Sequence, residues 1–163
     1  ASSKTALDAM RFLLDALADT EAKDQEGWTA LLHAARNSAA EAVMLLLERN
    51  ASVKARSKDG KTAPILATMD GGESLVMELI NKNAGYDKKD ERGWPVLFYA
   101  SESGRHDLVK WLLQKHAVVN EKAKDGSTPL MIAAQGGHIK VGEYLLKKHA
   151  NLNATTSLGF TAL

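Results

Sequence analysis

The chain has 163 residues, of which 45% are hydrophobic and 25% charged, and its formal net charge is +1. This composition is typical of a globular protein, and the balanced charge gives no general attraction to nucleic acid or anionic membranes. Cysteine is absent, which excludes disulfides and thiolate chemistry, and no apolar run approaches the roughly 20 residues of a membrane-spanning helix. The opening segment ASSKTALDAM does not have the pattern of a secretory signal, so we expect a cytoplasmic or nuclear protein.

In chain order, the first predicted element is a helix within residues 1–23, where AMRFLLDALAD forms a leucine-rich block. Residues 24–56 then combine a turn, the short apolar run WTALLHAA and a second leucine-rich block, AVMLLLERN. The same order returns three times and then begins once more. The turn glycines stand 33 residues apart, at Gly27, Gly60, Gly93, Gly126 and Gly159. A helix of about two turns is marginal alone, so this period predicts stacked units that bury one another's apolar faces.

The short helix of the last complete segment shows its boundaries most clearly, in DGSTPLMIAAQGGH. We expect the Thr128 hydroxyl to cap this helix, Pro129 to occupy its first position and Gly136-Gly137 to end it. The equivalent capping threonines are Thr29, Thr62 and Thr161. The segment 90–122 has Pro95 at this position, and losing a cap typically costs about 1 kcal/mol.

A 33-residue period with a turn, a short helix, a loop and a second helix resembles the ankyrin repeat, and the resemblance covers essentially the whole chain. The best local matches are GSTPLMIAAQGGHIKVGEYLLKKHANLNA and GWTALLHAARN. The resemblance implies an all-α ankyrin-repeat solenoid, in which stacked helix-turn-helix units carry β-hairpin fingers. It predicts a single ankyrin repeat domain over 1–163. Its parts are the second helix of a partial repeat in 1–23, full repeats at 24–56, 57–89, 90–122 and 123–155, and the start of a further repeat in 156–163.

Two columns of the repeat are expected to form the core. The alanines Ala34, Ala67, Ala100 and Ala133 let the first helices approach, and leucine pairs such as Leu112-Leu113 fill the layer between second helices. Trp111 falls in the same apolar column as Phe12, Leu45 and Tyr144, which indicates a core position. The family commonly has a left-handed glycine after each second helix. Here that column reads Asn50, Asn83, His116 and His149, residue types that tolerate positive φ.

No residue pattern predicts catalysis, a cofactor or a metal. His116 and His149 are equivalent residues of neighbouring repeats, but no carboxylate or cysteine shares their column, so we interpret them as helix-end residues. Gly136-Gly137 lacks the spacing and the lysine of a phosphate loop. The basic residues around Lys58 alternate with acids such as Asp59, which favours a solvated loop over a nucleic-acid patch.

One set of residues favours contact with a partner. Directly after the turn glycines stand Trp28, Lys61, Trp94, Ser127 and Phe160. The resemblance implies that this position is exposed at the tip of a finger, on the concave side. With adjacent repeats about 10 Å apart, the two tryptophan rings would lie ~20 Å apart with Lys61 between them. The alternative is that both rings lie flat on neighbouring fingers and stiffen the row.

These features predict a non-catalytic protein–protein interaction module, a scaffold or adaptor that binds another protein or a peptide segment. The alternative is a regulatory segment of a larger enzyme, channel or secreted effector protein. No small-molecule substrate, nucleic acid or membrane insertion is expected, and the isolated chain is expected to be a monomer with frayed or externally packed residues 156–163. By resemblance, the predicted contact residues are Trp28, Arg36, Asn37, Lys61, Met69, Asp70, Arg92, Trp94, Glu102, Lys124 and Gln135.

Overall fold

A computed structural model describes residues 3–163, with side chains from residue 5 onward. The chain divides into two compact units, unit 1 (Ala1–Gly85) and unit 2 (Tyr86–Leu163). Every regular element in the described residues is a helix, apart from one isolated antiparallel bridge between Arg56 and Thr62. The predicted all-α fold is therefore confirmed, whereas the single domain over 1–163 stays a prediction.

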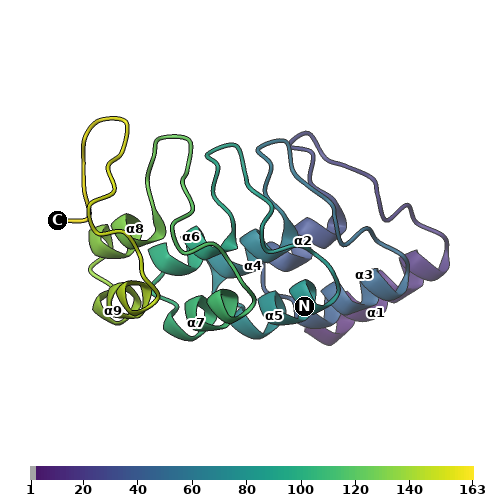
Figure 1. Cartoon of the computed structure of the whole chain (residues 1–163). Coiled ribbons are helices and arrows are strands. Elements are labelled where there is room, and N and C mark those ends of the chain that lie inside the picture. Colours follow the sequence, from purple (N-terminus) through teal and green to yellow (C-terminus); the bar gives the residue numbers. More distant parts are fainter. Residues whose placement is uncertain (1–2) are drawn as a thin grey trace. The chain divides into compact units, whose positions relative to one another are not determined.

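Unit 1 contains two first helices, which follow the turns, and three second helices. The first helices are α2 (Ala30–Arg36) and α4 (Ala63–Asp70), and the second helices are α1 (Ser3–Asp15), α3 (Ala40–Glu48) and α5 (Glu73–Asn81). The helix α2 packs against α3 and α4, α4 packs against α5, and α1 packs against α3. Figure 1 shows the turn loops on the side of the first helices and the second helices on the opposite side. The helix predicted in 1–23 is confirmed as α1.

Unit 2 repeats this arrangement with two helix pairs. Its first helices are α6 (Val96–Glu102) and α8 (Pro129–Gln135), and its second helices are α7 (His106–Gln114) and α9 (Ile139–Lys147). The two first helices pack on each other, the two second helices do the same, and each first helix packs on the second helix of its own repeat (Figure 1). Helices of seven to nine residues thus obtain their stability from neighbours, because such short helices are marginal in water.

The predicted core columns are largely confirmed within each unit. The column alanines are 0–8% exposed, and the first members of the leucine pairs, Leu46, Leu79, Leu112 and Leu145, are 0–1% exposed. The second members remain partly accessible, and Leu146 is 43% exposed. Phe12 is 73% exposed, so its assignment to the core column is wrong, and Trp111 is half-buried.

The backbone at both kinds of turn has the expected left-handed conformation. The turn glycines have φ values between 78° and 84°, and the column that replaces the family glycine has values between 65° and 68° at Asn50, Asn83, His116 and His149. Asparagine and histidine are among the non-glycine residues that accept this conformation best. The prediction that His116 and His149 are helix-end residues is confirmed.

The capping prediction is correct in one repeat and wrong in two. The Thr128 hydroxyl accepts a hydrogen bond from the Met131 amide at 3.4 Å. In unit 1, Thr29 and Thr62 occupy the same position before their helices, but neither hydroxyl makes a capping bond, and both are buried without a hydrogen-bond partner in the described residues. Thr29 and Thr62 therefore have the same extended backbone conformation as Thr128, although their hydroxyls do not bond to the helix amides.

His138 ties the two helix pairs of unit 2 together. It precedes α9, and its Nε2 atom lies 2.7 Å from the carbonyl oxygen of Glu102, the last residue of α6. The carbonyl at the end of a helix has no partner within the helix, so this bond satisfies an orphan acceptor. The ring lies over Gly104, where an added Cβ would meet His138 Nδ1 at 2.5 Å.

Replacing Gly104 with alanine is expected to lower the melting temperature more than replacing Gly137 with alanine. Both glycines have left-handed φ values, 65° and 69°, so both changes cost about 1–2 kcal/mol in the backbone. An added Cβ at Gly137 meets nothing within 4 Å, whereas at Gly104 it displaces His138 from Glu102. Circular dichroism melts of the two variants make the comparison, and equal melting temperatures would show that His138 does not hold this turn.

Candidate functional site

The fingers are the loops that precede each first helix, and all of them close with the same two backbone hydrogen bonds. At 90–94 the Asp90 amide donates to the Trp94 carbonyl at 3.1 Å, and the Gly93 amide donates to the Asp90 carbonyl at 3.0 Å. The same pair of bonds recurs in the fingers that begin at Asp24, Ser57, Ala123 and Thr156. Apart from the bridge noted above, the described fingers contain no regular β-strand, so the predicted β-hairpins are present as turns.

Neighbouring fingers within a unit are joined by their backbones. In unit 1 the Lys58 amide donates to the Glu26 carbonyl at 3.1 Å, and the Lys58 Nζ atom donates to the Gln25 carbonyl at 2.7 Å. In unit 2 the Lys124 amide donates to the Arg92 carbonyl at 3.0 Å. These bonds fix the spacing of successive fingertips, and they direct the lysine stems across the adjacent turn glycines.

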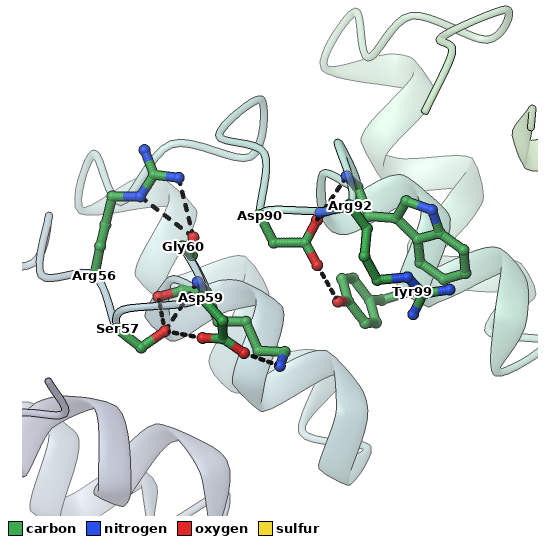
Figure 2. Close-up of polar contacts among 9 residues, drawn as sticks. Arg56, Ser57, Asp59, Gly60, Asp90, Arg92 and Tyr99 are labelled. Atoms are coloured by element: carbon green, nitrogen blue, oxygen red, sulfur yellow. Dashed lines mark hydrogen bonds and ion pairs between the residues drawn. The ribbon is translucent and has the colours of Figure 1, made fainter. Parts of the chain in front are cut away.

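Asp90 organises the finger of unit 2 that precedes α6. Its carboxylate accepts hydrogen bonds from the Arg92 amide at 2.9 Å, the Trp94 amide at 2.8 Å and the Tyr99 hydroxyl at 2.6 Å (Figure 2). Asp90 is 7% exposed and Tyr99 is 2% exposed. Burial, together with the bond to Asp90, raises the pKa of Tyr99, so this hydroxyl remains a donor throughout the neutral range.

Asp24 plays the equivalent part in unit 1, in a more exposed setting. Its carboxylate accepts from the Glu26 and Trp28 amides at 3.0 and 2.8 Å and lies 2.7 Å from His33 Nε2. The bond from the Trp28 amide is the main reason that the pKa of Asp24 lies below its ordinary value. Sequence reasoning missed both carboxylates. The available signal was that Asp24 and Asp90, like His33 and Tyr99, stand two repeats apart in the same columns.

The remaining complete fingers meet the same need with other side chains. In the 57–61 finger, the Ser57 hydroxyl accepts from the Lys61 amide at 3.0 Å and donates to Asp59, whose carboxylate also pairs with the Lys61 ammonium (Figure 2). In the 123–127 finger, Asp125 accepts from the Ser127 amide and hydroxyl. Hydrogen bonds from Ser127 lower the pKa of Asp125. At Asp59 burial alone raises the pKa, but the hydrogen bonds from Lys61 and Ser57 together with the Lys61 charge bring it below its ordinary value.

The two tryptophans predicted to be exposed differ from that expectation. Trp94 is only 3% exposed, so the prediction of an exposed fingertip ring is wrong there. Its ring packs against both Phe98 and Tyr99, with centroid separations of 5.4 and 5.3 Å, and the Arg92 guanidinium carbon lies 3.6 Å from its centroid. Trp28 is half-buried against His33 at 5.0 Å. Large rings in the same column are thus buried or exposed according to the side chains of their own repeat.

The predicted contact residues of unit 1 lie on its fingertips and on the ends of its first helices, but their charges are paired. Arg36 at the end of α2 lies 3.5 Å from Asp70 at the end of α4, and Lys61 pairs with Asp59 of its own finger. Met69 and Asn37 are exposed beside them.

Four predicted residues of unit 2 come together around one cavity of about 330 Å³. Arg92 and Trp94 form the finger side, and Glu102 and Gln135 contribute from the ends of α6 and α8. Asp125 and Ser127 of the next finger complete the polar wall, with Ile132 and Gly136 also lining the cavity. Lys124 is exposed and is not among the residues that line it. We call this feature the unit 2 cavity.

Two further observations concern the described residues only. Among them, no three His, Cys, Asp or Glu side chains are grouped closely enough to hold a metal ion. None of the helices in residues 3–163 has the length and apolar character needed to cross a membrane.

Comparison with known families agrees with the geometry. A family model described as ankyrin repeats, in three copies, matches residues 1–90, 50–123 and 65–156. The chain therefore belongs to the ankyrin repeat family, whose members are in general protein–protein interaction modules. No curated protein matches the sequence closely enough to add a more specific relationship.

Replacing Trp94 with alanine is expected to lower the free energy of unfolding by about 3–5 kcal/mol, the usual cost of truncating a buried tryptophan. The equivalent change at Trp28 is expected to cost clearly less, because its ring is half-exposed, whereas Trp94 is buried. Urea denaturation of the two variants measures the difference. Equal losses of unfolding free energy would show that packing on Phe98 and Tyr99 adds nothing to the stabilisation that a tryptophan at this position of the finger provides.

Replacing Asp90 with alanine is expected to destabilise the protein more than replacing Asp24 with alanine. At Asp90 the change leaves the buried Tyr99 hydroxyl and the Trp94 amide without an acceptor, and each unsatisfied group costs about 1–3 kcal/mol. At Asp24 water can reach the freed donors, because the side chain is 36% exposed. Urea midpoints test this ordering, and adding Tyr99→Phe to Asp90→Ala should recover part of the loss. A reversed order would contradict the role assigned to Asp90.

Proposed function

We propose that this protein is a non-catalytic scaffold or adaptor that binds a partner protein through its finger face. The finger face comprises the fingertips and the exposed ends of the first helices, which are α2 and α4 in unit 1 and α6 and α8 in unit 2. The observation that carries the proposal is the unit 2 cavity, where side chains from a fingertip and from two first helices converge. The same surface would serve a regulatory segment of a larger protein.

The finger face combines a rigid backbone with exposed polar side chains, and this combination supports a role in binding a partner protein. Each fingertip is held by at least two backbone hydrogen bonds and by a side-chain acceptor in the finger. Arg92, Glu102 and Gln135 are nevertheless exposed at the ends of these rigid elements. Rigid placement lowers the entropy that a surface loses on binding, and arginine is among the residues that most often dominate interface energetics. A cytoplasmic or nuclear location and a monomeric isolated chain are parts of the same proposal.

The test combines partner capture with matched variants on two faces. Partners recovered on the immobilised chain are purified, and their affinities are measured for the wild type, Arg92→Ala, Glu102→Ala and Lys110→Ala. Lys110 is exposed on the second helix α7 of the same unit and is the control. We expect the Arg92 and Glu102 variants to bind at least about tenfold more weakly, as for interface hot spots, and the Lys110 variant to bind normally. A partner that is lost only with Lys110→Ala would place the interface on the second helices and contradict the proposal.

A further inference from the structure

The charged side chains of the finger face differ between the two units in whether they already have partners. In unit 1, Arg36 pairs with Asp70 and Lys61 pairs with Asp59, so the two predicted contact cations of this face are neutralised internally. In unit 2, within the part of the chain that the structure describes, the side chains of Arg92, Glu102 and Gln135 take part in no hydrogen bond or ion pair, although all three line the unit 2 cavity. The unit 2 cavity therefore presents unpaired charges of both signs.

Arg92 is held in place without using its hydrogen-bond donors. Its guanidinium carbon lies 3.6 Å from the Trp94 ring centroid, and its backbone amide and carbonyl are bound to Asp90 and Lys124. Stacking on an aromatic face uses the plane of the guanidinium and leaves its N–H edge free. An arginine fixed in this way is suited to bidentate binding of a carboxylate, because little rotamer entropy remains to be lost.

The cavity wall also carries carboxylates. Glu102 ends α6 and exposes its carboxylate, while its carbonyl is occupied by His138. The Asp125 carboxylate also lines the cavity, although it already accepts two hydrogen bonds from Ser127. A single positive group stacked on Trp94 and two carboxylates thus surround the same space, and the exposed Gln135 amide can donate or accept beside them.

From this arrangement we propose that the unit 2 cavity binds a protein segment with an acidic side chain that pairs with Arg92 and, close to it, a basic side chain that pairs with Glu102. The inference rests on the proposed protein-binding function and specifies the charged side chains that the partner segment carries. A segment of one charge sign would meet a like charge in the unit 2 cavity, and such contacts disfavour wrong partners. A segment with both signs satisfies Arg92 and Glu102 at once.

A charge-reversal experiment on the full chain tests this complementarity. Random 12-residue peptides displayed on phage are selected against the wild-type protein, and we expect enrichment of sequences that carry an acidic and a basic residue a few positions apart. The best peptide is then measured against Arg92→Glu and Glu102→Lys, where we expect at least about tenfold weaker binding from the new like-charge contact. Peptides with the acidic residue changed to lysine should recover binding to Arg92→Glu. Peptides with the basic residue changed to glutamate should recover binding to Glu102→Lys.

The control variant is Lys110→Glu, which makes the same change in net charge as Arg92→Glu within the same unit but lies on α7, away from the finger face. It should bind the selected peptide as the wild type does, and melting temperatures of all variants identify any loss of fold. Selected peptides without a charge preference, or peptides whose binding no reciprocal swap recovers, would overturn the inference while leaving the proposed function intact. If the wild type selects no peptide and captures no partner, the proposed function fails, and the inference fails with it.

Discussion

The shortness of the helices is the constraint on which the rest of this structure depends. The first helices α2, α6 and α8 have seven residues each, too few to be stable in isolation. Their stability comes from burying one face against neighbouring helices of the same unit, where alanines allow close approach. A helix that is fully engaged in this way has little surface left, so its solvent-exposed end and the finger before it are the parts available for recognition.

The second requirement is that the amides of each finger find acceptors while the chain reverses direction. Every complete finger meets it with a side-chain oxygen, but the residue differs: Asp24 and Asp90 at the first position, Ser57 at the same position, and Asp125 two residues later. Because the acceptor is close in sequence to the amides that it binds, each repeat solves the problem locally. The backbone geometry therefore stays constant while the side chains of the finger vary.

The fold follows from the sequence because its determinants are local and repeated. The spacing of turn glycines, the alanine column and the asparagine–histidine column each specify one backbone or packing feature, and the structure has them where the pattern predicted. The burial of Trp94 was not predictable from its column, because it depends on Phe98, Tyr99 and Arg92 of the same repeat. The free hydroxyls of Thr29 and Thr62 were missed for a similar reason, since their residue type alone suggested capping.

The charge of each fingertip depends on the residues that follow the turn acceptor. In the 57–61 finger the Ser57 hydroxyl accepts from the Lys61 amide and donates to Asp59, and Asp59 also pairs with the ammonium of Lys61. In the 90–94 finger the buried Asp90 carboxylate accepts from both the Arg92 and the Trp94 amides. The residue equivalent to Asp59 is Arg92 itself, so this finger has no second acid at that position. Trp94 then offers a flat surface on which that arginine can rest. Two turns with the same backbone thus differ in surface charge because Asp59 and Lys61 in one are replaced by Arg92 and Trp94 in the other, and a repeat protein can vary its recognition chemistry in this way without changing its fold.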